Sequence, residues 1–556
     1  MADSRHSGRL RAPLFLRYTT LYASLCLLLA ACGGGGDGVA TSPIIAPPVA
    51  PQQAGPDPLL SQQWHLFNSG QSGGIAGMDI GLRNVGETGA GIVIAFIDGA
   101  IEVAHPDLSP NHLAGRGKNY LDGSSDPSPP NRAPGSPAEE RPGGADDAHG
   151  TAVAGIAVAR QGNSTGGRGV APDARFFGMN AVARPTNTNL ADALRHAVDQ
   201  GADIINNSWG PLDPASGGSR SYYDASSAWQ DALQLALETG RAGKGAIVVF
   251  AAGNGGQQGD DSNRDGYANA NGVIAVGAFD DRGRPATYSE PGSNVLVAAP
   301  SGNIVGRAFT TQGILTTDIS GPRGEAAGTT AETADYQRFF AGTSAAAPMV
   351  SGVAALMLQA NPRLSWRDVR WLLAHTAQPA RPTAADEPAV PTPVNAHGYQ
   401  RKLGFGRADA QRAVEAARAF GGLPPAVHCM SERLSDGRPI PDSDDAGLTV
   451  AHRFDGCRIR VVEFVEVRLE VDHPYTGDLH LTLDSPGGLR SVLATVHLCG
   501  PSGSGSCSGL TQGWTFGSVR HLGEPARAGT WVVQVSDRQA EDVGRLIATQ
   551  VVLHGH

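Results

Sequence analysis

Residues 349–358 are mostly apolar and carry the 3.6-residue period of a helix, so the sequence predicts that this helix is buried. The preceding segment 342–348 reads Gly-Thr-Ser-Ala-Ala-Ala-Pro and places Ser344 where a loop becomes the helix. A serine hydroxyl is a weak nucleophile unless a base accepts its proton and N–H groups stabilise the oxyanion that forms. A catalytic role for Ser344 therefore requires a base elsewhere in the chain.

Two upstream stretches supply the partners that such a serine needs. His149 lies in Asp-Asp-Ala-His-Gly-Thr, at a junction between a loop and a helix, and Asp98 ends the apolar segment 92–98, which has the pattern of a buried strand. Each stretch alone has an ordinary interpretation, as a helix cap, a turn or the end of a strand. All three together, in the order Asp98, His149 and Ser344, indicate a catalytic triad in which His149 is the base.

The order of these residues and the motifs around them resemble those of the subtilisin-like serine proteases, and more closely their kexin/furin branch. The resemblance runs from about residue 57 to the C-terminus. It implies a serine endopeptidase with an Asp-His-Ser triad. It also implies that Asn254, in the segment Ala-Ala-Gly-Asn-Gly-Gly, donates its side-chain amide to the oxyanion.

The chain after residue 170 alternates between helical and strand patterns. Residues 190–200 and 228–237 have helical periodicity, whereas 203–206 and 246–251 are short apolar runs typical of buried strands. This alternation predicts an α/β fold with a doubly wound parallel sheet covered by helices on both faces, and the resemblance implies its subtilisin-like form. We expect this catalytic domain to span residues 57–423.

From about residue 424 the pattern changes to period-two strands separated by turn residues. The expected strands are 467–471, 478–483, 531–535 and 548–553. They predict an all-β sandwich domain at 424–556. Motifs such as Thr-Gly-Asp-Leu at 476–479 resemble the P domain of proprotein convertases, which implies a jelly-roll-like sandwich that stabilises the protease domain. The alternative is a sandwich that binds carbohydrate or protein.

Residues 1–31 have the features of a signal peptide: an Arg-bearing start and an apolar run that is too short for a stable membrane span. Leu-Ala-Ala-Cys at 29–32 resembles a bacterial lipobox, which makes Cys32 the lipidated first residue of the mature protein. The Gly- and Pro-rich segment 32–56 is then a flexible stalk. We expect an exported protein that is anchored at the bacterial outer membrane or cell surface, or released from it. Plain secretion after cleavage nearby is the alternative.

The positions of the cysteines and the net charge limit the possible disulfides, the class of protease and the kind of partner. Four cysteines lie near the end of the chain, at Cys429, Cys457, Cys499 and Cys507. An even number in an exported chain suggests two disulfides, and of the three pairings we favour the two local ones, Cys429 with Cys457 and Cys499 with Cys507. The segment 57–423 contains no cysteine, which excludes a thiol protease. A net charge of −10 argues against nucleic acid as a partner.

The resemblance also implies calcium as a cofactor, held at two sites by oxygen ligands of the kind that hard cations prefer. The first set of side chains is Asp57, Asp107 and Asn163, completed by main-chain carbonyls. The second set is Asp213, Asp260 and Glu290, beneath the pocket for P1, the substrate residue on the N-terminal side of the cleaved bond.

Specificity is inferred from the same resemblance. Ser208, Trp209 and Gly210 are assigned to the wall of the P1 pocket, and Asp213 and Asp265 to its lining. Buried carboxylates favour an incoming guanidinium, so we expect Arg at P1. Gly99 stands where the kexin branch has a second Asp, and Arg195 where furin has an acidic residue for P4. Asp146 remains as an attraction for a basic P2, and strict multibasic selection is not expected.

These inferences predict a monomeric, calcium-dependent serine endopeptidase that cleaves proteins or peptides after basic residues. The alternative is a catalytically silent surface adhesin that binds through its β domain. The segment 57–66 resembles the first segment of mature kexin-type proteases and follows the stalk directly, so we expect no N-terminal prodomain. Folding is then unassisted or helped by a separate chaperone protein.

Overall fold

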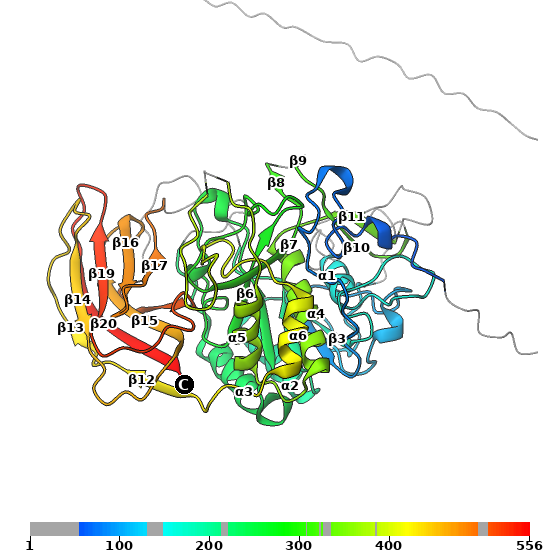
Figure 1. Ribbon diagram of the computed structural model, residues 1–556, viewed down its shortest axis with the longest axis horizontal. Helices are drawn as coiled ribbons and strands as arrows, with labels where there is room; N and C mark the ends of the chain where they lie inside the picture. The colour runs from blue at the N-terminus through cyan, green and yellow to red at the C-terminus, as the bar shows by residue number, and fades with distance from the viewer. Residues whose placement is uncertain are drawn as a thin grey trace, which may run out of the picture. The chain divides into compact units, whose positions relative to one another are not determined.

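The computed structural model describes residues 55–130, 148–212, 221–306, 308–321, 324–325, 335–383, 386–498 and 510–556. Residues Ala54–His556 form one compact unit, in which a helix-covered sheet is followed along the chain by a region built of strands (Figure 1). The expected signal peptide and stalk lie outside the described residues, apart from the end of the stalk. So do five of the predicted site residues: Cys32, Asp146, Asp213, Cys499 and Cys507.

A seven-stranded parallel sheet has the order β2-β3-β1-β4-β5-β6-β7. Its strands are β1 (Val93–Asp98), β2 (Lys118–Asn119), β3 (Arg175–Asn180), β4 (Ile204–Asn207), β5 (Ile247–Ala251), β6 (Val273–Phe279) and β7 (Val295–Pro300). The longer strands are apolar and almost wholly buried, as expected for a parallel sheet covered on both faces. Strand β1 lies between β3 and β4 in the interior of the sheet. Its last residue, Asp98, therefore lies at the edge formed by the carboxyl ends of the strands, away from the two outermost strands.

Helices cover both faces of this sheet (Figure 1). They are α1 (His149–Val158), α2 (Asn187–Asp199), α3 (Ser227–Gly243), α4 (Thr343–Ala360), α5 (Trp366–Thr376) and α6 (Ala410–Ala419). Ile94 and Phe96 of β1 pack in one apolar core with α1, α4, α5 and α6, whereas Ala95 and Ile97 pack in a second core with α2 and α3. The doubly wound α/β fold predicted from the sequence is therefore confirmed.

Helix α4 is the apolar helix that follows Ser344. It is buried from Thr343 to Leu358 and contacts β4, β5, β6 and β7. The packing is close, since a Cβ atom on Gly352 would lie 2.6 Å from the Cβ of Val170. The helix is long and apolar enough to cross a membrane, but 89% of it is buried inside the protein, so its apolar composition reflects a place in the core.

Short elements complete this region. Strands β8 (Ile304–Val305) and β9 (Ala308–Phe309) form one antiparallel pair, and β10 (Ile314–Thr317) and β11 (Tyr336–Phe340) form another. The 3-10 helices are η1 (Leu60–Gln62), η2 (Gln71–Gly73), η3 (Ser109–Asn111), η7 (Gly256–Gln258), η8 (Ser262–Arg264) and, later in the chain, η10 (Thr476–Asp478). Strand β11 leads directly to Ser344, and η8 follows β5 towards the substrate pocket.

The C-terminal region is a sandwich of two antiparallel sheets around a core of its own. One sheet has the order β12-β20-β15-β18, with β13 also paired to β20, and the other has the order β14-β19-β16-β17. The strands are β12 (Val427–Met430), β13 (Leu434–Ser435), β14 (Leu448–His452), β15 (Val462–Asp472), β16 (Leu479–Asp484), β17 (Arg490–Ala494), β18 (Trp514–Ser518), β19 (Trp531–Asp537) and β20 (Arg545–Gly555). The expected all-β domain is confirmed.

The four strands expected in this region correspond to β15, β16, β19 and β20, and two of them are much longer than the sequence pattern suggested. Strands β12, β13, β14, β17 and β18 were not predicted, since they are short or lack a clear alternation of apolar and polar residues. A disulfide joins Cys429 and Cys457, one of the two local pairs that we favoured. It connects β12 to the segment that follows β14.

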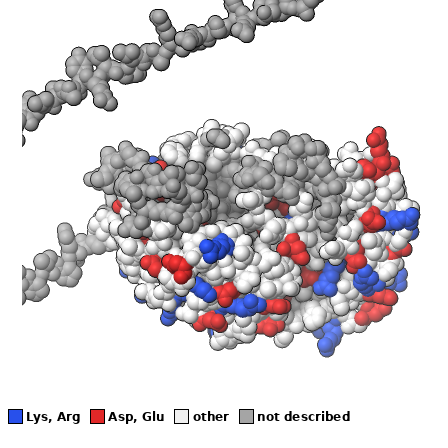
Figure 2. All heavy atoms as spheres, turned by 180° about the vertical axis from the view of Figure 1, so that it is seen from behind, with Lys and Arg blue, Asp and Glu red and all other residues white. Residues whose placement is uncertain are grey.

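Charged side chains of both signs are mixed over the surface. Figure 2 shows Lys and Arg interspersed with Asp and Glu on the described part of the face opposite to that of Figure 1. Many of these side chains are paired, as in the ion pairs Arg418–Glu87, Arg433–Glu470 and Arg490–Asp484. Such exposed pairs each contribute at most about 1 kcal/mol to stability.

Candidate active site

Asp98 and His149 form a hydrogen-bonded pair at the carboxyl edge of the sheet. The Asp98 Oδ1 atom lies 2.7 Å from His149 Nδ1 and also accepts a hydrogen bond of 2.7 Å from the main-chain N–H of Gly99. The ring of Phe340 packs edge-on against the imidazole, with centroids 5.4 Å apart. Because a carboxylate accepts the proton on Nδ1, the other ring nitrogen, Nε2, is left as the basic atom of His149.

Ser344 lies in the first turn of α4 and is buried. Its hydroxyl donates a hydrogen bond of 3.1 Å to the main-chain oxygen of Ser208, and the Ser208 hydroxyl donates one of 3.0 Å to the main-chain oxygen of Ser344. Gly342 enters the helix with a φ of 89°, a value that favours glycine. The sharp turn places Ser344 at the positive end of a helix, where negative charge on a reacting group is stabilised.

Asn254 is held by the residue before Ser344. Its Oδ1 atom accepts hydrogen bonds from the main-chain N–H of Thr343, at 2.8 Å, and from the Thr343 hydroxyl, at 3.0 Å. The preceding Gly253 has a φ of 108°, which again favours glycine. Since Oδ1 is bound to Thr343, the amide orientation is fixed and its Nδ2 donor has a defined direction.

One cavity of about 330 Å³ joins these groups. The predicted site residues that line it are Asp98, His149, Ser208, Trp209, Gly210, Asn254, Asp260, Asp265, Glu290 and Ser344. They come from the ends of β1, β4 and β5, from the starts of α1 and α4, and from the loops after β5 and β6. The structure therefore brings together all the predicted catalytic residues and those substrate residues that it describes, at the sheet edge where ligands of α/β proteins bind.

Carboxylates gather on one side of this cavity. Asp265 is buried, its Oδ1 atom accepts the main-chain N–H of Tyr267 at 2.8 Å, and a Cβ atom on Gly210 would lie 3.2 Å from its Oδ2. Glu290 Oε1 accepts the N–H of Gly255 at 2.9 Å. The absence of a side chain at Gly210 thus leaves room beside Asp265. The negative charge of these groups favours a cationic ligand in the cavity.

Arg264 also lines the cavity, a place that was not predicted from the sequence. Its guanidinium is buried, donates to the main-chain oxygen of Gly259 at 3.1 Å and lies 3.4 Å from Asp260 Oδ1. This side chain partly neutralises Asp260, one of the ligands expected at the second calcium site. The residues described there therefore fit a calcium ion less well than the resemblance suggested. The available signal for Arg264 was one basic residue among the three acidic ones of the segment Asp-Asp-Ser-Asn-Arg-Asp at 260–265.

The first set of expected calcium ligands is brought together. Asn163 Nδ2 lies 2.6 Å from Asp107 Oδ1, and the Asp57 carboxylate accepts the N–H groups of Gly162 and Asn163 at 2.9 and 3.1 Å. Burial raises the pKa of Asp107 to about 6, and the charge of Asp57 adds to this effect. Two carboxylates that disfavour each other's charge suit a hard cation, although in the structure Asn163 turns its Nδ2 towards Asp107, its Oδ1 accepts the N–H of Thr165, and Asp107 Oδ2 accepts the Tyr336 hydroxyl.

Within the part of the chain that the structure describes, no group of three or more His, Cys, Asp or Glu side chains has the arrangement of a metal site. The first set contains two carboxylates and one amide, so it does not depend on such a cluster. Of the second set, Asp213 lies outside the described ranges.

The structure also describes Gly99 and Arg195, the two residues inferred to weaken selection for a basic P2 or P4. Gly99 lines the cavity beside Asp98, so the structure has no side chain at this place. Arg195 lies on α2 and its guanidinium donates to the main-chain oxygen of Ala228 at 2.9 Å. Among the described residues, Arg195 is not part of the cavity wall.

A parallel α/β sheet with an Asp–His pair, a buried serine at a helix N-terminus and an anchored asparagine defines the class of the serine hydrolases with a subtilisin-like site. Residues 89–406 match the subtilase family, and residues 462–553 match the proprotein convertase P-domain. The chain belongs to the subtilase family.

Curated relatives include several convertases. A PC3-like endoprotease variant B of Hydra vulgaris is 33% identical over 495 residues, which are 87% of this chain and 64% of that protein. Neuroendocrine convertase 2 of Homo sapiens is 31% identical, with 90% of this chain and 74% of the relative covered. The dibasic-processing endoprotease of Schizosaccharomyces pombe is 31% identical over 87% of this chain and 63% of its own length. The chain thus spans less than two thirds of the Hydra and yeast relatives.

A solved structure is similar over almost the whole chain. The serine protease of Aeromonas sobria, in complex with a chaperone, has a TM-score of 0.77 and 26% identity, with 90% of this chain and 95% of that chain covered. The free form of the Aeromonas sobria protease has a TM-score of 0.75 and 27% identity, with coverage of 90% and 96%. Both the sheet domain and the sandwich are included in these matches.

Proposed function

We propose that this chain is a serine endopeptidase that cleaves peptide bonds after basic residues, with Arg preferred at P1. The observation that carries the proposal is the single cavity that contains the Asp98–His149 pair, Ser344 and a group of carboxylates. The relatives support it, since they include convertases and a dibasic-processing endoprotease. A silent adhesin would have no need for the hydrogen-bonded arrangement of these side chains.

In the proposed mechanism Asp98 holds His149 with Nε2 towards the nucleophile. The Ser344 hydroxyl, which donates to the Ser208 oxygen in the structure, turns to His149 when a substrate binds, and His149 takes its proton as Oγ attacks the scissile carbonyl. The oxyanion accepts a hydrogen bond from Asn254 Nδ2 and lies near the N-terminus of α4. His149 then gives the proton to the leaving amine, and water repeats the sequence to release the acyl group.

The P1 side chain is proposed to enter the space beside Gly210 and to pair with Asp265. Arg suits this place because its planar fork donates two parallel hydrogen bonds to a carboxylate. Asp213 is proposed as a second lining carboxylate. Since Gly99 offers no charge, a basic P2 is proposed to help modestly through Asp146, and a basic P4 not at all.

We also propose that calcium binds at Asp57, Asp107 and Asn163. The ion supplies a positive charge that offsets the two carboxylates and fastens the segment before η1 to the loop after α1. The three side chains lie on separate segments, so their shared ligand is a structural one. A second calcium ion at Asp213, Asp260 and Glu290 remains a prediction, to be weighed against the guanidinium of Arg264 at Asp260.

Export and anchoring complete the proposal. We propose that residues 1–31 direct export and that lipidation of Cys32 tethers the enzyme to the outer membrane or cell surface through the stalk 32–56. A separate chaperone is proposed to assist folding, because the Aeromonas sobria protease was solved in complex with one. The second local disulfide, Cys499 with Cys507, is part of the same proposal.

The proposal is tested with a fluorophosphonate, which labels an activated serine, and with a panel of peptides that differ at P1. The unmutated protein is expected to be labelled and to cleave after Arg, and Ser344→Ala is expected to lower kcat by about 10⁶-fold and to remove labelling. His149→Ala should also prevent labelling. Labelling that persists in Ser344→Ala would contradict the assignment of the nucleophile.

A further inference from the structure

Strand β18 of the sandwich lies directly against the loop that carries the acidic side of the cavity. The loop consists of residues 259–265 and contains Asp260, the 3-10 helix η8 and Asp265. The loop also contains Asn263, whose side chain is fully buried. A buried polar side chain requires hydrogen-bond partners, and strand β18 supplies two of the three that the Asn263 amide has.

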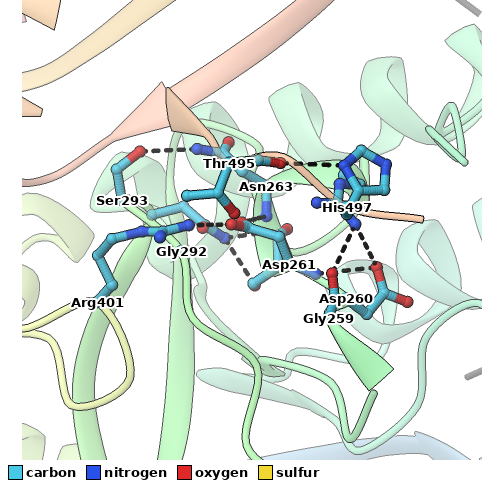
Figure 3. Close-up of polar contacts among 12 residues, drawn as sticks. Gly259, Asp260, Asp261, Asn263, Gly292, Ser293, Arg401, Thr495 and His497 are labelled. Carbon is cyan, nitrogen blue, oxygen red and sulfur yellow. Dashed lines mark hydrogen bonds and ion pairs between the residues drawn. The ribbon is translucent and has the colours of Figure 1, made fainter. Parts of the chain in front are cut away.

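The amide of Asn263 forms a two-way pair with the main chain of Gly517. The N–H of Gly517 donates to Asn263 Oδ1 at 2.8 Å, and Asn263 Nδ2 donates to the Gly517 oxygen at 2.9 Å. Nδ2 also donates to the Ser293 hydroxyl at 2.7 Å, a contact that can be followed in Figure 3. The amide of Asn263 therefore pairs with Gly517 in the way that the main chain of a neighbouring strand would pair with it.

The main chain of Asn263 is held by the same strand. The indole N–H of Trp514 donates to the Asn263 oxygen at 3.0 Å, and Asn269 Nδ2 donates both to this oxygen, at 3.0 Å, and to the oxygen of Thr515, at 2.9 Å. The approach is close, since a Cβ atom on Gly517 would lie 2.3 Å from the Asn269 oxygen. No side chain other than glycine fits there without a shift of the strand.

The loop is also fixed on its catalytic-domain side. Asp261 Oδ1 accepts the N–H of Asn263 at 3.0 Å, and Asp261 Oδ2 pairs with the guanidinium of Arg401, as Figure 3 shows. Arg264 and Asp265 follow Asn263 directly, and the Arg264 oxygen accepts the N–H of Tyr223 at 2.8 Å. Asn263 is thus the point where the sandwich holds a loop whose next two residues line the substrate cavity.

We propose that Asn263 is a positioning residue for P1 selectivity, and that strand β18 sets the place of the Asp265 carboxylate through it. The sandwich domain then does more than stabilise the protease domain, because it fixes the distance between Asp265 and a P1 guanidinium. A displacement of about 1 Å at such a group costs up to about 10²-fold in rate. The inference rests on the proposed preference for a basic P1.

The test compares two contacts across the same boundary between sheet domain and sandwich. Asn263→Ala removes the side-chain pair with Gly517 of β18, while the main-chain bond from Trp514 remains. Glu463→Ala removes a contact elsewhere: Glu463 of β15 accepts hydrogen bonds from Arg367 of α5, at 2.9 Å from Nε, and lies 2.8 Å from His556 Nδ1. Glu463 does not line the cavity and is a matched control for general loosening of the boundary.

Three quantities are measured on the full chain: kcat/KM for matched peptides with Arg or Leu at P1, the rate of fluorophosphonate labelling, and the thermal unfolding midpoint. Asn263→Ala is expected to lower the Arg-to-Leu ratio about tenfold, mainly through a higher KM for the Arg peptide. Its labelling rate should stay within about twofold of the unmutated value, because the triad is not moved. Glu463→Ala is expected to lower the midpoint but to leave the ratio unchanged.

Two further variants keep the test decisive if Asn263→Ala is not recovered as folded protein. Ser293→Ala removes one hydrogen bond from the Asn263 amide, and Gly517→Ala pushes β18 away from the loop, so both should lower the ratio. A ratio that is unchanged in these variants, or that falls equally in Glu463→Ala, would overturn the inference alone. An unmutated protein without preference for Arg at P1 would overturn the proposed function and this inference together.

Discussion

Ser208 and Ser344 are joined by two reciprocal hydrogen bonds, each from the hydroxyl of one residue to the main-chain oxygen of the other. Ser208 follows β4, and Ser344 lies in the first turn of α4. Behind them, Ser351 of α4 donates to Asn206 Oδ1 at 2.8 Å, and Asn206 Nδ2 donates to the Ser208 hydroxyl at 3.0 Å. These bonds hold Ser344 against the wall of the substrate cavity, and in the proposed mechanism its hydroxyl must leave the Ser208 oxygen before it can donate to His149.

Asn254→Ala should lower kcat by about 10²–10³-fold with little change in KM, because the lost donor acts on the oxyanion and not on the bound substrate. Thr343→Val should lower kcat by a smaller factor, since it removes one of the two bonds that orient the amide. Steady-state kinetics with a P1 Arg peptide measure both. An Asn254→Ala protein with a normal kcat would show that the oxyanion is held by other groups.

Removal of calcium should destabilise the protein through Asp57 and Asp107. A bound ligand stabilises the folded state by about 2.7 kcal/mol at 100 times its Kd, which for a protein of this size is about 3 °C in the unfolding midpoint. The midpoint is measured by calorimetry with calcium and then with a chelator, and added calcium should restore it. Asp57→Asn should be insensitive to the chelator. A midpoint of the unmutated protein that ignores prolonged chelation would contradict the site.

Asp265→Ala should remove most of the preference for Arg over Leu at P1. A hydrogen bond between charged groups contributes about 1.5–3 kcal/mol, which corresponds to about 10 to 150-fold in kcat/KM. Asp265→Asn is the matched variant, since it keeps the size of the side chain but removes its charge. Competition between two peptides in one digest gives the ratio directly. Preference for an aromatic P1 in the unmutated protein would show that the cavity is occupied differently.

His65 should make the protein sensitive to acid. Burial lowers the pKa of His65 from 6.5 to about 3, and within the described residues neither ring nitrogen has a hydrogen-bond partner. Between these two pKa values the unfolded chain binds a proton that the folded chain does not, so the free energy of unfolding falls as the pH decreases below 6.5. At pH 5 the loss is about 2 kcal/mol.

Urea unfolding at pH 7 and pH 5 measures this effect. His65→Phe, which keeps an aromatic ring without a titratable group, should lose about 2 kcal/mol less than the unmutated protein between the two pH values. His428→Phe is the control, because His428 is exposed and should have no such effect. Equal acid sensitivity of the unmutated protein and His65→Phe would show that His65 is protonated without cost.

The fold of the sheet domain and its candidate catalytic residues could be predicted because these residues lie at the ends of strands and the starts of helices. Strand and helix patterns fix the direction of each strand, so Asp98, Asn254 and the segment before Ser344 were expected at one edge of the sheet. The resemblance to the kexin/furin branch assigned Asp107 and Asn163 to one calcium site, and in the structure these two side chains are in contact. Short strands such as β2, β8 and β13 have too few residues for a period to be read from the sequence.

Arg264 and Asn263 show why the rest of the site was not predicted. The direction of a side chain on one turn of 3-10 helix cannot be read from residue order, so the pairing of Arg264 with Asp260 was not foreseen. The partners of Asn263 at Gly517 and Trp514 are about 250 positions away in the chain. Contacts of that separation depend on how two domains dock, and single-sequence periodicity carries no information about docking.

The contact between Asn263 and strand β18 also sets an order of events during synthesis. A chain is made from its N-terminus, and domains tend to fold as they emerge. Ser344, His149 and Asp98 have all been synthesised some 170 residues before Trp514. A partly synthesised protease domain would thus hold its nucleophile before its P1 carboxylate is fixed. Under the proposal, selectivity for P1 depends on a strand that is made late, with only β19 and β20 of the sandwich still to follow.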